Sequence, residues 1–275
     1  MNNKTESRKY IDEINQKDCY DFNDLCGIMA LLRSEQGCDW DKEQTHKSIR
    51  KNLIEETYEV IEAIDNDDFT LMREELGDLL LQVVFHSQIA REEGSFGIDG
   101  VIDELCRKLI VRHPHVFGDI SVTGSNEVLS NWDKIKASTK KHKSITQAME
   151  SISPAMPSLM RAAKIGSKGA KAGFDFDDSA DALTKVKEEA LEVEKALGEG
   201  NVERLSEEIG DLLLAVVNVA RLSGIDCEEA LYKANDKFIS RFCTVEQKAL
   251  EQGIDLLSAA RDTKEALWQR AKETN

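Results

Sequence analysis

The chain has 275 residues, of which 41% are hydrophobic and 32% are charged, and its formal net charge is −16 at pH 7. This composition is that of a folded protein, and the length suits one large domain or two of ordinary size. An acidic excess of this kind opposes binding to nucleic-acid phosphates, and the longest apolar run, around residues 79–85, is far too short to cross a bilayer, so we expect neither nucleic acid nor a membrane as partner.

The amino-terminal stretch MNNKTESRKY is polar, and it predicts an arm over residues 1–20 rather than a signal peptide. No two cysteines form a CxxC pair, which favours reduced thiols over disulfides or a zinc site. The protein is therefore expected to be cytoplasmic. The six cysteines are Cys19, Cys26, Cys38, Cys106, Cys227 and Cys243.

Only three prolines interrupt a sequence rich in Glu, Lys, Leu and Ala, so helix is expected nearly throughout. Apolar residues at three- and four-residue spacing predict a helix over 48–64, which the acidic stretch 65–68 interrupts. Asp68 is the expected N-cap of a long helix over 69–94. Residues 21–120 are predicted to form a first helical domain.

The segment 121–160 is rich in Ser, Thr and Lys, and it predicts a linker with one helix around Trp132. Residues 161–275 are predicted to form a second helical domain. Its helix break lies at 198–201, where glycine stops one helix and Asn201 caps the next. No strand pattern occurs, so the predicted fold class is all-α.

The two predicted domains repeat one sequence. EELGDLLLQVV (74–84) and EEIGDLLLAVV (207–217) agree at nine of eleven positions and lie 133 residues apart. EETYEVIEAI (55–64) and EEALEVEKAL (188–197) recur at the same offset. The landmarks keep their order, which indicates internal duplication.

Folding each helix pair back at its break is expected to bring carboxylates together. Because each helical residue rises about 1.5 Å, residues at equal counts from the break lie at matched heights on the two helices. In the first half, counting outward from the break pairs Glu59 with Glu75 and Glu56 with Asp78. In the second half, the same count pairs Glu192 with Glu208 and Glu189 with Asp211.

Acids at the edge of an apolar stripe repel one another unless a cation neutralises them. All-oxygen ligands suit Mg²⁺, and Mn²⁺ is the other ion that fits. Di-iron bundles use Glu-x-x-His, whereas Asp or Glu stands at that position here, which argues against redox chemistry. The alternative is that the acids merely coat a solvated helix face. The duplication of the whole spacing favours a metal site.

Basic landmarks also recur in both halves. A Lys and an Arg one turn apart could grip a phosphate chain, and a Trp followed four residues later by Lys could stack a base and contact a phosphate. Taken singly, the first is an ordinary surface pair and the second a packing anchor, so both interpretations stay open. The residues are Lys108, Arg112, Trp132 and Lys136 in the first half and Lys237, Arg241, Trp268 and Lys272 in the second.

These residues resemble the MazG family of nucleoside triphosphate pyrophosphohydrolases, whose signature is EExxE followed by ExxD. The flanking stretches CDWDKEQTH (38–46), VRHPHVFGD (111–119) and AGFDF (172–176) are also similar to that family. The resemblance covers the chain from about Cys26. The signature stands here as Glu55, Glu56 and Glu59 with Glu75 and Asp78, and as Glu188, Glu189 and Glu192 with Glu208 and Asp211.

The resemblance implies two tandem MazG-like helical-bundle domains that are completed by dimerisation into a homodimer. It also implies Mg²⁺-dependent hydrolysis of nucleoside or deoxynucleoside triphosphates to the monophosphate and pyrophosphate, by attack of water on the α-phosphorus. Glu189 is the candidate that orients or deprotonates the water. We expect broad specificity and a housekeeping role in controlling nucleotide levels.

The two halves differ in the cations beside the acids. Lys185 and Arg204 lie one turn before the second set of acids, where the first half has Asn52 and Leu71. We therefore expect the second half to be the stronger catalyst, unless these cations are only solvent-side partners of neighbouring Glu. Two alternatives for the function stay open: a non-catalytic metal- or nucleotide-binding regulator, and a narrower pyrophosphohydrolase for dUTP, dCTP or phosphoribosyl-ATP.

Overall fold

The structure is a computed structural model that describes residues 4–125, 127–128, 131–132, 135 and 144–274. The described residues form helices and connecting segments with no strand, as the sequence predicts. The chain divides into two compact units, Met1–Thr139 and Lys140–Asn275. All six cysteines are free thiols. Within the described residues, no helix is both long enough and apolar enough to cross a membrane.

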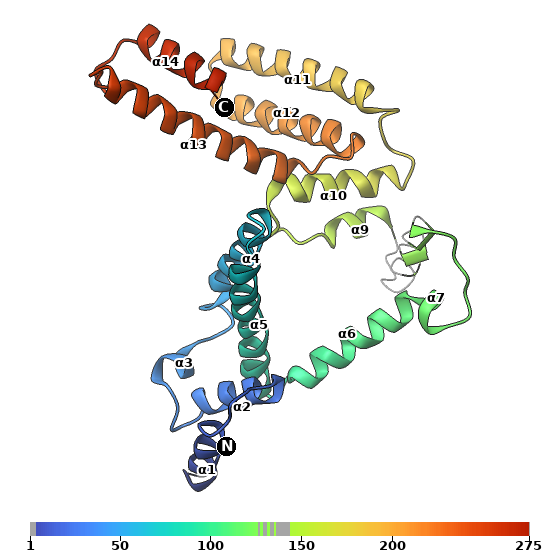
Figure 1. Cartoon of the computed structure of the whole chain (residues 1–275). Helices are drawn as coiled ribbons and strands as arrows, with labels where there is room; N and C mark the ends of the chain where they lie inside the picture. Colours follow the sequence, from blue (N-terminus) through green and yellow to red (C-terminus); the bar gives the residue numbers. More distant parts are fainter. Residues whose placement is uncertain (1–3, 126, 129–130, 133–134, 136–143, 275) are drawn as a thin grey trace. The chain divides into compact units, whose positions relative to one another are not determined.

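In the first unit, α5 is the central helix and is contacted by α2, α4 and α6 (Figure 1). A small core of buried apolar side chains lies where these elements meet: Met29, Ile49, Val84, Phe85 and Ile89. The helices are α1 (Lys4–Ile14), α2 (Phe22–Leu32), α3 (Asp39–Glu43), α4 (Arg50–Asp65), α5 (Phe69–Glu92), α6 (Ile98–Arg112) and α7 (Pro114–Phe117).

The reversal between α4 and α5 forms as the sequence predicts. Asp67 adopts a left-handed conformation with φ of 52°, which Asp tolerates better than most residues. The side chain of Asp68 accepts hydrogen bonds from the backbone N–H groups of Thr70 and Leu71, both at 3.0 Å, and so caps α5. The two helices are thereby joined by a three-residue turn.

Arg33, directly after α2, connects the end of α5 to the segment before α4. Its side chain is only 6% exposed and its Nη2 lies 2.7 Å from Oε2 of Glu92. Its Nη1 donates to the carbonyl oxygens of Asp41 and Gln44. One buried guanidinium therefore holds the stretch that leads into the acidic helix α4.

In the second unit, α12 is contacted by α10, α11 and α13, and α14 packs on α13 (Figure 1). The core between α13 and α14 contains Val245, Ala249, Leu267 and Ala271. The helices are α9 (Ile145–Glu150), α10 (Ser158–Ala170), α11 (Ser179–Glu199), α12 (Val202–Leu222), α13 (Cys227–Glu251) and α14 (Arg261–Thr274).

The second hairpin also reverses at the predicted break. Gly200 has φ of 67°, a conformation that a residue with a Cβ rarely adopts, and it ends α11. Asn201 then accepts a hydrogen bond from the backbone N–H of Arg204 at 3.1 Å, which confirms it as the cap of α12. Ala182, Ala196 and Ala215 are buried, and their small side chains allow α11 and α12 to lie close together.

Candidate active site

The first hairpin brings three carboxylates from two helices together. Glu56 lies on α4, and Glu75 and Asp78 lie on α5. One carboxylate oxygen of each lies within 4.8 Å of the others. The pairing of Glu56 with Asp78 that the helix count predicts is therefore confirmed.

The second hairpin repeats this group at the equivalent positions. Oxygens of Glu189 on α11 and of Glu208 and Asp211 on α12 again lie within 4.8 Å of one another. Glu189 is only 7% exposed. The duplication in sequence is thus a duplication of geometry, and we call the two groups the first cluster and the second cluster.

The first cluster is strongly anionic. Burial raises the pKa of Glu56, and the carboxylates of Asp78 and Glu59 raise it further. Burial and the charge on Glu59 likewise raise the pKa of Glu75, so the predicted proximity of Glu59 and Glu75 is confirmed. Among the described residues, no Lys or Arg forms an ion pair with these four acids. Bringing a cation to this place would relieve their repulsion.

The second cluster, in contrast, has cations in place. Nζ of Lys185 lies 2.6 Å from Oε1 of Glu189 and 2.8 Å from Oε1 of Glu188. The hydrogen bonds to Glu188 and Glu189 raise the pKa of Lys185. Lys185 therefore lies beside the acids, as the sequence predicts.

Arg204 makes a second set of contacts in this cluster. Its Nη1 lies 2.6 Å from Glu199, its Nη2 3.1 Å from Glu192, and its Nε 3.4 Å from Glu208. Glu192 and Glu208 thus share one guanidinium, which places both where the helix count predicts. Lys185 and Arg204 are also ion-paired with neighbouring glutamates. The expectation that they lie beside the acids and the alternative that they are partners of neighbouring Glu therefore each describe the structure in part.

The donor set fits a hard divalent cation. Both clusters contain only carboxylate oxygens, without His or Cys. Six of the ten predicted ligands belong to the two clusters, and Glu59 and Glu192 lie directly beside them. Glu55 is exposed, and Glu188 is exposed and bound to Lys185, so the structure leaves these two outside the groups.

The second-half basic and aromatic landmarks lie on α13 and α14. Trp268 contacts Phe238 with ring centroids 5.0 Å apart and packs on the core between the two helices. Arg241 is half-buried, and its Nε has no hydrogen-bond acceptor among the described residues. Lys237 and Lys272 are exposed. Within the described part of the chain, none of these four residues is hydrogen-bonded to the second cluster.

A pocket of about 520 Å³ lies beside Trp268. Its walls are aromatic and aliphatic, and its polar side chains come from the first turns of α14. The aromatic residues that line it are Phe238, Phe242 and Trp268, and the charged residues that line it are Arg261, Lys264 and Glu265. A flat aromatic ring fits such a pocket chemically.

The first-half landmarks form local contacts. Nζ of Lys108 lies 2.6 Å from Oε1 of Glu104 on the same helix, an ordinary exposed pair. The guanidinium of Arg112 lies 5.4 Å from the ring centre of Trp132, a cation–π contact. Trp132 lies in a helical segment, as predicted. Lys136 lies outside the described residues.

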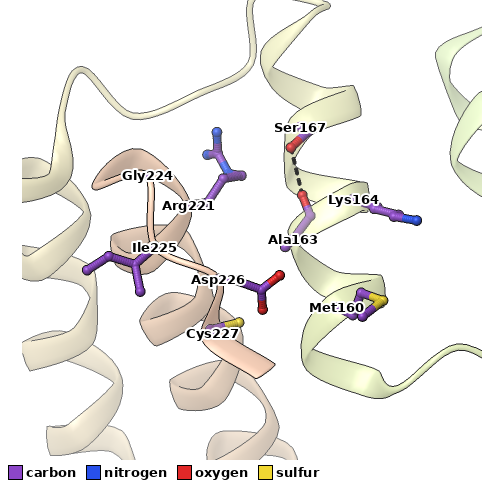
Figure 2. Close-up of a pocket in the computed structure, with 9 residues that line it drawn as sticks. All are labelled: Met160, Ala163, Lys164, Ser167, Arg221, Gly224, Ile225, Asp226 and Cys227. Atoms are coloured by element: carbon purple, nitrogen blue, oxygen red, sulfur yellow. Dashed lines mark hydrogen bonds between the residues drawn. The ribbon is translucent and has the colours of Figure 1, made fainter. Parts of the chain in front are cut away.

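Another pocket, of about 300 Å³, lies between α10 and the end of α12 (Figure 2). It contains the cations Lys164 and Arg221. Arg221 is already committed to a bidentate ion pair with Asp175. Arg221 lies ten residues beyond Asp211 on α12, about 15 Å along the helix, so this pocket is separate from the second cluster.

One polar residue near the first cluster is missed by the sequence argument. Gln82 is buried on α5, seven residues after Glu75. A signal for it exists, because Gln82 and Ala215 are one of only two differences between the repeated eleven-residue stretches. A search of the sequence for carboxylates alone does not detect Gln82, because its side chain is an amide.

Comparison with known proteins agrees with the duplicated geometry. A family model described as the MazG nucleotide pyrophosphohydrolase domain matches residues 44–117 and again residues 178–246. Each match contains one acidic cluster.

Curated relatives extend the similarity over nearly the whole chain. The Nucleoside triphosphate pyrophosphohydrolase/pyrophosphatase MazG of Thermotoga maritima is 43% identical over 251 residues, which is 91% of this chain and 95% of the relative. The Nucleoside triphosphate pyrophosphohydrolase of Escherichia coli is 44% identical over 251 residues, 90% of this chain and 95% of the relative. The uncharacterized protein YabN of Bacillus subtilis is 44% identical over 277 residues, 100% of this chain and 56% of the relative.

Proposed function

The chain belongs to the MazG family of nucleotide pyrophosphohydrolases, and from this we propose that it hydrolyses nucleoside and deoxynucleoside triphosphates to the monophosphate and pyrophosphate at its second cluster. The observation that carries the assignment to this cluster is the presence of Lys185 and Arg204 beside Glu189, Glu208 and Asp211. Three carboxylates can hold a divalent cation, and two adjacent cationic side chains suit a triphosphate.

We propose Mg²⁺ as the physiological ion, with Mn²⁺ as a substitute. Glu189, Glu208 and Asp211 would hold it, because hard oxygen donors match its preference. When bound there, the ion supplies charge neutralisation for the phosphate oxygens and lowers the pKa of a bound water.

Lys185 and Arg204 would exchange partners when the substrate binds. They form ion pairs with Glu188, Glu189, Glu192 and Glu208. With a divalent cation held by these acids, the ammonium and guanidinium groups would be available for phosphate oxygens, Lys as a point charge and Arg as a planar fork. In that arrangement the two positive charges would stabilise the negative charge that develops on the leaving pyrophosphate.

Glu189 is the proposed acceptor of the proton from the attacking water. It is the most buried acid of the second cluster, and a carboxylate removed from bulk water can hold a water in one orientation. Attack on the α-phosphorus releases pyrophosphate and leaves the monophosphate.

The pocket beside Trp268 is the proposed site of the base. Phe238 and Trp268 would provide faces for stacking. Glu265, which accepts a hydrogen bond from Gln269, is the one side-chain acceptor among the aromatic and charged residues that line the pocket. A pocket that binds mainly by stacking discriminates weakly between bases. This supports broad specificity rather than selection of a single nucleotide.

We further propose that the protein is a homodimer, whose partner chain completes each helical bundle. The support is the exposure of apolar side chains on helices that also carry the acids. On α12, Ile209, Leu213 and Val216 are 44%, 50% and 45% exposed. Apolar stripes of this kind on a folded chain are typical of association surfaces.

Incubating the purified protein with ATP or a deoxynucleoside triphosphate and Mg²⁺ tests the proposed function. The expected products are the monophosphate and pyrophosphate, with none formed in EDTA. Glu189→Gln should keep the fold and lower kcat by about a hundred-fold or more. Intact nucleotide after prolonged incubation would indicate a binding protein, and ADP with phosphate would contradict attack at the α-phosphorus.

A further inference from the structure

Gln82 is a buried polar side chain without a visible partner. It is only 6% exposed, and its buried Oε1 accepts no hydrogen bond from any residue that the structure describes. An unsatisfied carbonyl oxygen in the interior costs stability, and such groups are rare in folded proteins. The unsatisfied Oε1 of Gln82 therefore indicates that a group outside the described residues contacts this atom.

Helix geometry places Gln82 on the acidic face of α5. Glu75, Asp78 and Gln82 are spaced by three and four residues, so they follow one another along a single face. On the antiparallel helix α4, Glu56 lies opposite Asp78, and Ile49, just before α4, shares the core with Phe85. Gln82 therefore lies in the layer between the first cluster and the core.

The equivalent layer of the second unit has different chemistry. Ala215 replaces Gln82 and offers only a methyl group, and Lys185 replaces Asn52. Lys185 forms ion pairs with Glu188 and Glu189. The second cluster thus has adjacent cations and a methyl group at the position of Gln82, whereas the first cluster has an amide there and no ion-paired cation among the described residues.

We propose that Gln82 is a further metal-contacting residue. Its Oε1 faces a divalent cation held by Glu56, Glu75 and Asp78, directly or through one water, and it enables the first cluster to bind that cation without nucleotide. The proposal deepens the proposed function, because it rests on the same kind of cation at the duplicate of the proposed catalytic cluster. Neutral amide oxygens are ordinary ligands of hard cations.

The contrast between the two clusters explains why the first cluster, unlike the second, should bind the cation in the absence of nucleotide. At the second cluster an incoming cation competes with Lys185 and Arg204 for the same carboxylates. Phosphate oxygens relieve that competition by accepting the displaced side chains. At the first cluster no such exchange is needed, because oxygens of Glu56, Glu75 and Asp78 lie within 4.8 Å of one another and, among the described residues, no Lys or Arg forms an ion pair with them.

Titration of the full chain with Mn²⁺ in the absence of nucleotide tests the proposal. Glu208→Gln combined with Asp211→Asn silences the second cluster, so calorimetry then reports the first. In this background Gln82→Met, which keeps the side-chain length and removes the carbonyl, should weaken Mn²⁺ binding by about ten-fold. Leu81→Met, a volume-conserving change at the adjacent residue, should leave the affinity unchanged.

Thermal unfolding in EDTA separates metal contact from a structural role. Because Gln82→Met removes an unsatisfied buried oxygen, the metal-free variant should melt at or above the temperature of its parent. The proposal is overturned if the parent background binds no Mn²⁺, if Gln82→Met binds it with parental affinity, or if the variant instead melts at a lower temperature in EDTA.

Failure of this inference can be told from failure of the proposed function. If the unmodified chain hydrolyses nucleoside triphosphates but Mn²⁺ binding is independent of Gln82, only the role of Gln82 is wrong. If Mn²⁺ binding depends on Gln82 but the unmodified chain hydrolyses no nucleotide, only the proposed function is wrong.

Discussion

At the scale of single residues, two acidic groups of the same design differ in how their charge is balanced. Glu56 and Glu75 have raised pKa values, and burial is the largest cause for both. The corresponding acids of the second unit, Glu189 and Glu208, are paired with Lys185 and Arg204. The first cluster is therefore a place of net repulsion, and the second is a network of ion pairs.

This difference predicts how Glu75→Gln acts on stability. A carboxyl group whose pKa is raised by folding contributes stability below its unfolded pKa and loses it as the pH rises through the folded value. In EDTA at neutral pH, the variant should therefore melt a few degrees above the parent. The difference should vanish below about pH 4, where the group is protonated in both states.

The measurement is thermal unfolding across a pH series, first in EDTA and then with Mg²⁺. Adding Mg²⁺ should stabilise the parent more than the variant, because the variant has lost a ligand. Glu62→Gln, an exposed change on α4, is the matched control and should have little effect. A variant that melts below the parent in EDTA at neutral pH would contradict net repulsion among the acids of the first cluster.

At the scale of elements, α5 and α12 carry the same two stripes. One stripe holds the acids, and the other holds apolar residues that lie on a different face of each helix. The apolar positions are equivalent in the repeat and all are at least 38% exposed: Leu76, Leu80 and Val83 on α5, and Ile209, Leu213 and Val216 on α12. A helix with two such faces needs a partner on each of them.

Leu213→Glu therefore tests the proposed dimer. A charge in the middle of an association surface opposes burial of that surface, so the variant should be monomeric by light scattering while its circular dichroism stays helical. Lys187→Glu, an exposed charge change on α11, is the control and should stay dimeric. A monomeric parent, or a variant that dimerises like its parent, would contradict the role of this stripe.

Local rules predict the hairpins and their register. Asp68 and Asn201 cap the helices that the sequence assigns to them, and counting residues from the breaks pairs Glu56 with Asp78 and Glu189 with Asp211. These features depend on backbone geometry and short spacings, which a sequence displays directly.

Contacts between distant side chains could not be predicted in this way. Arg33 and Glu92 are 59 residues apart, and Phe238 meets Trp268 only because α14 folds back on α13. The division of Arg204 among Glu192, Glu199 and Glu208 depends on side-chain rotamers. Burial of Gln82 likewise depends on packing. The periodicity of the sequence indicates only on which face of the helix Gln82 lies.

At the scale of the whole molecule, the chain contains one helical design twice, and the copies have diverged around a retained set of acids. The retained part is the pair of hairpins with their three-carboxylate groups. The divergent part is the surrounding charge, with Lys185 and Arg204 in one copy and Gln82 in the other. Divergence of this kind supports a division of roles, with hydrolysis at the second cluster.

Pyrophosphate release from ATP with Mg²⁺, compared between Glu208→Ala and Glu75→Ala in the full chain, tests this claim most directly. We expect Glu208→Ala to lose nearly all release, because the second cluster loses a proposed ligand and Arg204 loses a partner. Glu75→Ala should retain most of it. Loss of release in Glu75→Ala with near-parental release in Glu208→Ala would contradict hydrolysis at the second cluster.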